Sequence, residues 1–413
     1  MSEPITFING FLIDGAGAEP VPGAVVIVED EVIKEVGPAG TRPPSPGRVI
    51  DLQGRTLMPG LIDAHVHPGA LALSLERQLA LPPAVYVLRT VRNLETDLAL
   101  GFTTLREACT LDQSFKEAVN QGLIRGPRLF LAVSQLVQSG AEDYQPGFIP
   151  QEAPPQNSLG LRAQVCDGPD EVRRGARRAL GLGADQIKVF ASGEVISQSH
   201  SDRTTPDQWK FTVEELRAAV ETAEACGTYV MAHAYGPRAI KNCVAAGVRS
   251  LEHGNLMDRE AAEMMAEQGT YYVPTLSAYH VLARENRGEL TPFMREKLAM
   301  VEHKAFEALE MAYRAGVKIA SGSDVVGPNQ HLKGRELVLK AEVMSPLEAI
   351  VSATRTNAEL INMSDRLGTV EPGKLADLIV VDGNPLADLS LFENGLERVV
   401  LVMKQGAIVK NLM

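Results

Sequence analysis

Several features are scarce or missing in this chain of 413 residues. It has only four cysteines, Cys109, Cys166, Cys226 and Cys243, and no two of them form a C-x-x-C motif. Scattered cysteines favour reduced thiols in a cytoplasm-like compartment, and we expect none of them to bind metal. No run of about 18 apolar residues is present, so no membrane span is expected. The net charge of -12 argues against nucleic acid or an anionic membrane as a partner.

The start of the chain also lacks a feature. Met1, Ser2, Glu3 and Pro4 offer neither a basic nor an apolar leader segment, so we expect no secretion signal and a cytoplasmic location. A leader removed beforehand would leave no trace. What is present is an ordinary globular composition, with 45% hydrophobic and 22% charged residues. The length exceeds one ordinary domain and matches a barrel of about 250 residues plus a smaller module.

The two ends of the chain share one pattern. Residues 1–56 alternate short β-branched runs with turns such as Asn9-Gly10, and the same texture returns in Asp377–Asp382 and Arg398–Met403. Neither end has enough strands to form a stable sheet structure alone. We therefore predict that both ends combine into one small β-sandwich.

Between the ends, apolar strand-like runs alternate with helix-like segments. One helix start is marked by a capping box, Thr212-x-x-Glu215. Eight strand–helix units can be counted, and that number predicts an α/β fold of the closed (β/α)8 TIM barrel type rather than an open sheet. The predicted organisation is 1–57 for the first part of the sandwich, 58–366 for the barrel and 367–413 for the second part.

Polar residues interrupt or end the predicted barrel strands. Taken singly, Lys188 could be a snorkelling side chain, His233 a core histidine and Asp324 a turn cap. In a barrel, however, all strand ends open at one face, where catalytic residues collect. The residues in this position are His65, His67, Lys188, His233, His253 and Asp324.

These motifs resemble the amidohydrolase superfamily of metal-dependent hydrolases over nearly the whole chain. The resemblance includes the tail Leu367–Asp382. The segments Ile187–Gly193, Ala232–Gly236 and Leu251–Gly254 are similar to the branch with Xaa-Pro dipeptidases (prolidases), related C-terminal carboxypeptidases and imidazolonepropionase-like proteins.

The resemblance implies a site for two divalent ions, and the chemistry of the residues agrees with it. His65, His67 and Asp324 would hold one ion, and His233 and His253 the other. Lys188, carbamylated by CO2, would bridge both ions, since a buried lysine can lose its proton and the carbamate supplies two oxygens. A hydroxide shared by the ions would attack the amide, with Asp324 as the general base. Zn²⁺ fits this ligand set best, and Mn²⁺ or Co²⁺ would substitute.

Substrate contacts are predicted at three positions. Tyr235 follows the strand-five histidine, where the family places a substrate-binding tyrosine. Arg203 would bind a carboxylate, or else be a solvated loop arginine, and His331 would lie at the rim or be exposed. Related dipeptidases carry a histidine in a loop after strand three, but the matching stretch Gln138–Asp143 has none. The long loop 139–167 is expected to cover the mouth.

We therefore predict a binuclear hydrolase, in homo-oligomeric form, that cleaves an amide bond beside a C-terminal amino acid of a dipeptide, Xaa-Pro-like or N-acyl amino acid substrate. One alternative is an amidohydrolase acting on an arylamide, phenylurea, carbamate or lactone. A second is a non-catalytic barrel protein serving in assembly, although such relatives have lost metal ligands that this chain retains. A third is a mononuclear deaminase or imidazolonepropionase, against which Lys188 argues.

Overall fold

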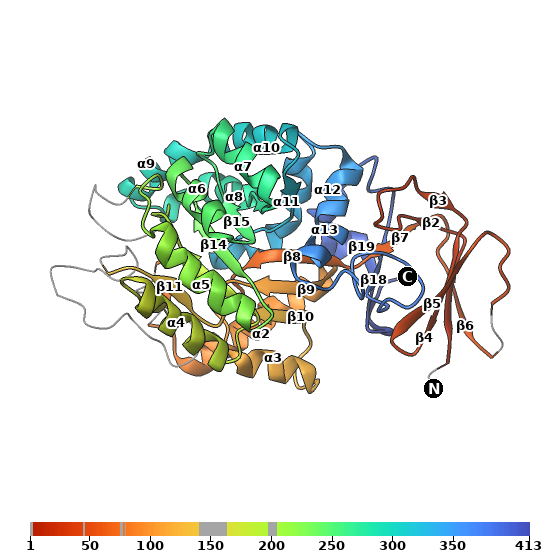
Figure 1. The fold of residues 1–413 in the computed structure, drawn as a ribbon. Helices are drawn as coiled ribbons and strands as arrows, with labels where there is room; N and C mark the ends of the chain where they lie inside the picture. The colour runs from red at the N-terminus through yellow and green to blue at the C-terminus, as the bar shows by residue number, and fades with distance from the viewer. Residues whose placement is uncertain (1–2, 44–45, 75–76, 79, 140–162, 197–204) are drawn as a thin grey trace.

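The computed structural model describes residues 3–413 except 44–45, 75–76, 79, 140–162 and 197–204. Figure 1 shows two regions: strands from both chain ends, drawn in red and dark blue, lie together beside a larger region of strands and helices. Among the described residues, no helix has both the length and the apolar character needed to cross a bilayer.

The chain ends form two sheets, a four-stranded one in the order β5-β4-β1-β6 and a six-stranded one in the order β20-β19-β18-β7-β2-β3. Strands from both ends therefore pair within one sheet. Phe7 and Val26 of the first sheet share a buried apolar cluster with Leu57, Val380 and Leu401 of the second. The strands are β1 (Ile5–Ile8), β2 (Phe11–Leu12), β3 (Val21–Pro22), β4 (Val25–Glu29), β5 (Val32–Gly37), β6 (Arg48–Asp51), β7 (Thr56–Pro59), β18 (Leu378–Val381), β19 (Val399–Lys404) and β20 (Ala407–Asn411).

The middle of the chain forms two parallel sheets, β10-β9-β8 and β12-β11-β13-β14-β15-β16-β17. Strands of both sheets are buried along their whole length, and most of their residues are apolar. The strands are β8 (Leu61–Val66), β9 (Phe102–Glu107), β10 (Arg128–Leu131), β11 (Gln135–Val137), β12 (Ala163–Val165), β13 (Ile187–Phe190), β14 (Val230–Ala234), β15 (Ser250–His253), β16 (Tyr271–Val273) and β17 (Lys318–Ile319).

Helices connect these strands, and α5 begins at the capping box predicted from sequence. The Thr212 N–H donates to Glu215 Oε2 at 2.8 Å, and the Glu215 N–H donates to Thr212 Oγ1 at 3.3 Å. The helices are α2 (Pro83–Ala99), α3 (Gln113–Asn120), α4 (Pro169–Gly181), α5 (Val213–Ala225), α6 (Pro237–Ala246), α7 (Arg259–Gln268), α8 (Leu276–Arg284), η2 (Arg287–Glu289), α9 (Pro292–Val301), α10 (Lys304–Arg314), η3 (Gly327–Gly334), α11 (Arg335–Lys340), α12 (Pro346–Ser352), α13 (Arg355–Leu360), η4 (Leu389–Phe392) and α14 (Gly395–Arg398).

One strand differs from the sequence prediction. The apolar run 128–133 predicts one strand, but β10 ends at Leu131 and β11 begins only at Gln135, with Val133 between them at a φ of 63°. A β-branched residue rarely adopts this left-handed conformation, which ends the strand. As a result β10 pairs with β9 while β11 pairs with β13, and the parallel strands are assigned to two sheets. The sequence also predicts a long helical region near 295–315, and α9 and α10 occupy it.

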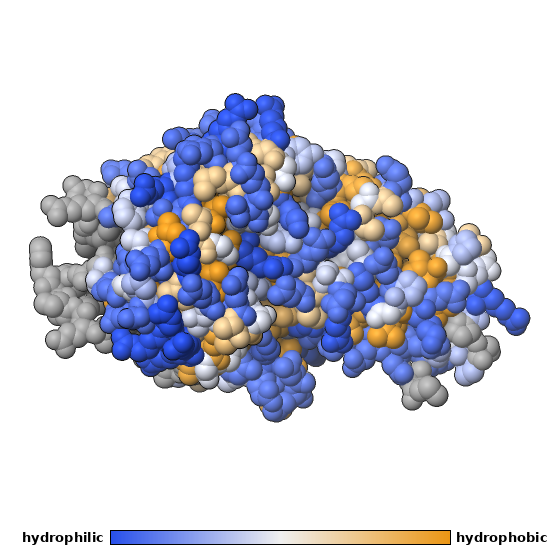
Figure 2. All heavy atoms as spheres, viewed as in Figure 1, coloured by the Kyte–Doolittle hydropathy of each residue, from blue (hydrophilic) through white to orange (hydrophobic). Residues whose placement is uncertain are grey.

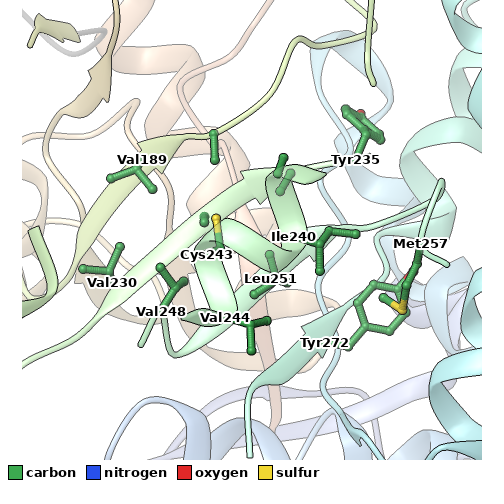
Figure 3. Close-up of a cluster of buried hydrophobic side chains, with 14 of the residues drawn as sticks. Val189, Val230, Tyr235, Ile240, Cys243, Val244, Val248, Leu251, Met257 and Tyr272 are labelled. Atoms are coloured by element: carbon green, nitrogen blue, oxygen red, sulfur yellow. The ribbon is translucent and has the colours of Figure 1, made fainter. Parts of the chain in front are cut away.

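Apolar helix faces cover the strands. In Figure 3, Ile240, Cys243 and Val244 of α6 lie over Val230 of β14 and Leu251 of β15, and all five belong to the largest buried cluster. The face of the molecule in Figure 2 is mainly hydrophilic, with apolar side chains in small groups. The helix faces therefore cover the sides of these parallel strands.

Candidate metal centre

Strand β8 ends with two histidines that point to the same space. The imidazole rings of His65 and His67 are 5.3 Å apart between centroids. Asp324 reaches them from the segment after β17, which is fixed to β8 by a hydrogen bond from the Asp324 N–H to the His65 carbonyl at 2.8 Å. Asp324 Oδ1 is 3.7 Å from His65 Nε2 and 3.3 Å from His67 Nε2. The three side chains offer ligand atoms within 4.8 Å of one another.

Three more strands complete the group. Lys188 of β13 is fully buried, and its Nζ is 3.5 Å from His65 Nε2. His233 of β14 and His253 of β15 have ring centroids 4.5 Å apart, and His253 lies 5.1 Å from His65. All six residues singled out in the sequence line one cavity of about 70 Å³. The structure thus brings together the residues predicted as ligands, and their binding of metal stays a prediction.

The backbone at this site is unusual. His253, Thr275 and Asp324 have φ values of 76°, 51° and 48°. Left-handed backbone is uncommon for residues other than glycine and tends to occur at functional sites. Here it turns each chain segment at the end of its strand and directs the side chain into or beside the cavity.

In three of the four histidines, one ring nitrogen already forms a hydrogen bond to a neighbouring residue. His65 Nδ1 donates to Glu252 Oε2 at 2.8 Å, and His233 Nε2 donates to the Gly193 carbonyl at 2.9 Å. His253 Nδ1 is hydrogen-bonded to Thr275 Oγ1 at 2.8 Å. Outer partners of this kind fix the tautomer and orientation of metal-binding histidines, and they leave the other nitrogen as the ligand atom.

Burial sets the charge state of the group. It lowers the pKa of His67 to about 3 and lowers the pKa values of His65, His233 and His253 well below the usual range. The imidazoles are therefore neutral, which is the form that binds metal. Burial also lowers the pKa of Lys188 and raises that of Asp324 to about 7, although the lysine opposes the second shift. Neutral nitrogens with one carboxylate fit a divalent ion such as Zn²⁺.

The predicted substrate-binding residues are placed differently from one another. Tyr235 lines the cavity, stacks on His253 at 5.1 Å between ring centroids, and accepts a hydrogen bond from Tyr279 Oη at 3.2 Å. His331 lies in η3, is exposed and is not among the residues that line the cavity. Arg203 and most of the 139–167 loop lie outside the described residues. The roles of all three residues stay predictions.

Sequence reasoning missed several residues around the site. Tyr279 lines the cavity, and its hydroxyl is 3.4 Å from Thr275 Oγ1. Arg106 and Glu252 lie beneath His65, each with no exposed side-chain surface. The sequences of their strands, Phe-Thr-Thr-Leu-Arg-Glu and Ser-Leu-Glu-His, already mix polar and apolar residues, so no local signal marks the last two. The cavity also has an apolar wall, formed by Phe190, Val195, Ile196, Ala278, Leu282 and Val326.

Comparison with known proteins identifies the family to which this chain belongs. The sequence pattern of the amidohydrolase family matches residues 56–409, so the chain belongs to the amidohydrolase family. An ochratoxinase from Aspergillus niger is 31% identical over 97% of this chain and 85% of its own length.

Solved structures agree with this assignment. A crystal structure of an amidohydrolase is similar with a TM-score of 0.93 and 41% identity, covering 99% of this chain and 100% of that chain. A crystal structure of a prolidase complexed with N-methylphosphonate-L-proline has a TM-score of 0.91 and 36% identity, with the same coverage. These likenesses confirm the predicted branch of the superfamily, and they identify the chain as a hydrolase acting on amide bonds.

Proposed function

We propose that this chain is a binuclear metal-dependent amidohydrolase that cleaves an amide bond next to a C-terminal amino acid, as in a dipeptide, an Xaa-Pro-like substrate or an N-acyl amino acid. The observation that carries the proposal is the convergence of four histidines, Asp324 and Lys188 on one buried cavity. The likeness to a prolidase and to an ochratoxinase supports an amide substrate.

We further infer that the parallel strands close into a (β/α)8 barrel. On one side, the Ala64 N–H of β8 donates to the Ser321 carbonyl just after β17 at 2.8 Å. On the other side, β10 and β11 are consecutive parts of one segment, and each pairs with a different sheet. A barrel would place the ends of β8, β13, β14 and β15 around one mouth.

In the proposed centre, His65, His67 and Asp324 would hold one ion, and His233 and His253 the other. Lys188 would contribute to both as a carbamate. Two divalent ions, Zn²⁺ by preference and Mn²⁺ or Co²⁺ as substitutes, would lower the pKa of a coordinated water and polarise the scissile carbonyl. The amidohydrolase likeness and the three closely spaced ligands His65, His67 and Asp324 support this arrangement.

Modification of Lys188 follows from its surroundings. An ammonium there would repel cations, and unit charges about 4 Å apart at an effective dielectric near 20 interact by roughly 4 kcal/mol. Burial lowers the lysine pKa, which favours the free amine that reacts with CO2. In that reaction the amine nitrogen bonds to the carbon of CO2 and releases one proton, giving an anionic carbamate.

Asp324 is proposed as the proton carrier. Its carboxylate faces the cavity with 20% of its side-chain surface exposed and lies 3.3–3.9 Å from nitrogens of three histidines. It would accept the proton of the attacking water and pass it to the leaving amine. Tyr235, at the cavity wall, would orient the substrate through its hydroxyl, while Arg203 and His331 are proposed as rim contacts.

One observation favours a second candidate function. Among the described residues that line the cavity, Lys188 is the only cation, so no other lining side chain offers a positive charge to a substrate carboxylate. A hydrolase of a neutral arylamide, phenylurea, carbamate or lactone would need none. The two candidate functions differ in whether the enzyme requires a free carboxylate on its substrate.

The deciding experiment compares matched substrates. Metal-loaded protein should be assayed on dipeptides and N-acyl amino acids, each as the free acid and as the C-terminal carboxamide, with His65→Ala as the metal-site control. Turnover of the free acids alone supports the first function. Equal turnover of both forms supports the second. Absence of turnover together with absence of bound metal would leave a non-catalytic barrel protein. Cytoplasmic location and homo-oligomer formation stay predictions.

A further inference from the structure

A buried ion pair lies directly beneath His65. Arg106 of β9 and Glu252 of β15 have no exposed side-chain surface, and Arg106 Nη2 donates to Glu252 Oε1 at 2.9 Å. The other oxygen of this carboxylate, Oε2, accepts the hydrogen bond of 2.8 Å from His65 Nδ1. The histidine and the arginine are therefore joined through a single carboxylate.

Further hydrogen bonds fix the carboxylate and the arginine. Ser250 Oγ donates to Glu252 Oε1 at 2.6 Å, and Arg106 Nη1 donates to Ser250 Oγ at 2.9 Å. Arg106 Nε donates to the carbonyl of Ala64, the residue before His65, at 2.6 Å. Arg106 thus contacts both the backbone next to His65 and the carboxylate that holds its ring.

We propose that Arg106 and Glu252 are positioning residues that set the tautomer and orientation of His65 and so raise the affinity of the metal position that His65 serves. Glu252 accepts the Nδ1 proton, which leaves the Nε2 lone pair directed at Lys188 and Asp324. Arg106 holds the buried carboxylate in place through its hydrogen bond to Glu252 Oε1. This inference rests on the proposed function, because it assumes that His65 binds metal.

A merely structural role is the competing explanation, since breaking any buried ion pair destabilises a protein. The chain offers a matched control. Lys333 Nζ and Asp97 Oδ1 are 2.6 Å apart, and their side chains are 2% and 1% exposed. This pair is nearly as buried as Arg106–Glu252, and among the described residues Asp97 contacts none of the six predicted ligands directly. Its link to the site is indirect: Lys333 also lies 3.7 Å from Asp63, which accepts the backbone N–H of His65 but does not contact its ring. Effects on metal affinity and on general stability can therefore be separated.

The test compares Glu252→Gln with Asp97→Asn. Each change replaces one buried carboxylate by an isosteric amide. Zn²⁺ affinity should be measured by competition with a chromophoric chelator, and thermal unfolding should be measured on the metal-free proteins. Loss of an outer partner of a metal-binding histidine typically lowers metal affinity about 10–100-fold. We expect that loss for one Zn²⁺ equivalent in Glu252→Gln, with Asp97→Asn within about twofold of the wild type.

A spectroscopic readout tests the tautomer directly. The chain has eight histidines, so ¹⁵N-histidine labelling gives a simple spectrum, and His65→Asn assigns the resonances of His65. In the metal-free wild type, His65 should be protonated at Nδ1, and Glu252→Gln should shift this signal while Asp97→Asn should not. If Glu252→Gln does not fold, Ser250→Ala serves instead, because it removes the hydrogen bond that Ser250 Oγ donates to Glu252 Oε1. Zn²⁺ affinity should then fall roughly 2–10-fold.

Three outcomes would overturn the inference in different ways. Unchanged Zn²⁺ affinity in Glu252→Gln, or in Ser250→Ala where that variant is used, would exclude the positioning role and leave the proposed function intact. An equal loss in Asp97→Asn would show a general effect of stability. Failure of the wild-type protein to bind Zn²⁺ at all would overturn both this inference and the proposed function.

Discussion

The core shared by the two terminal sheets and the interior beneath the strand ends differ in chemistry. The first is built mainly from apolar side chains such as Phe7 and Leu401, and its fully buried polar residues, such as Thr6 and Thr56, are uncharged. The second buries Arg106, Lys188 and Glu252 without exposure. Buried charge is unfavourable unless it is paired or hydrogen-bonded. We infer that the terminal sheets contribute mainly to stability, whereas the buried charges beneath the strand ends reduce stability and serve the proposed site. Each prediction below tests that division.

The largest expected effect is on catalysis. Asp324→Asn keeps an oxygen that can coordinate metal but removes the proton acceptor, so kcat should fall about 10²–10⁴-fold. The unfolding midpoint should change little, because the amide has the same size. Steady-state kinetics, metal analysis and thermal unfolding of the same preparation check this. A kcat near that of the wild type would remove Asp324 from the role of base.

The terminal core should show the opposite behaviour. Phe7→Ala leaves a cavity in a fully buried position, so the free energy of unfolding should fall by about 3–5 kcal/mol. The kcat of the protein that remains folded should be unchanged. Urea unfolding measures the first quantity and active-site titration the second. Phe11→Ala is the matched control, because Phe11 is 45% exposed and its loss should change stability by less than about 0.5 kcal/mol.

Lys188→Met should abolish activity and yet stabilise the metal-free protein. Replacing buried charged groups by apolar ones of similar size can stabilise by roughly 1–4 kcal/mol. Burial lowers the pKa of Lys188 below its usual value of 10.5. Below pH 10.5 the unfolded state therefore binds the lysine proton more readily than the folded state, and this proton binding disfavours folding. The gain should therefore be larger at pH 7 than at pH 10. Urea unfolding at both pH values tests this, and a destabilised variant would contradict it.

The smallest effect concerns backbone strain. Gln405 and Gly406 join β19 to β20 with φ values of 49° and 74°, a turn that favours Asn-Gly. Gln405→Asn should therefore raise the free energy of unfolding by about 0.5 kcal/mol without changing kcat. Thr275→Asn relieves a similar φ at the site but removes the hydroxyl bound to His253, so kcat should fall. Equal kcat in both variants would show that neither the hydroxyl nor the backbone strain at Thr275 serves a function.

Sequence reasoning succeeded where strand geometry decides the outcome. His65, His67, His233 and His253 each lie at the end of a predicted strand, and parallel strands bring their ends to one edge. The pairing of Phe190 with His233 and of Ala234 with His253 places those ends level, as the pattern predicts. Thr212 was likewise identifiable as a helix cap, because its signal is local.

Sequence reasoning failed where contacts between distant segments of the chain determine the structure. The pairing of Arg106 with Glu252 joins residues 146 positions apart, and no local pattern indicates it. The division of the strand at Val133 depends on a backbone conformation that the residue type disfavours. The contact of Tyr279 with Tyr235 arises because the first turns of α8 lie beside the cavity. That position follows from the fold and not from the spacing of residues in the sequence.

The pairing of β7 with β18 has a consequence for synthesis on the ribosome. Leu378 pairs with Pro59 although it lies 319 positions later in the chain. At about 5–20 residues per second, translation needs roughly 15–65 s to cover that distance. During this interval the nascent chain carries one open edge of β7, and exposed edges are templates for aggregation. Completion of this sheet must therefore be a late step of folding, after the strands that bear the site residues have already been made.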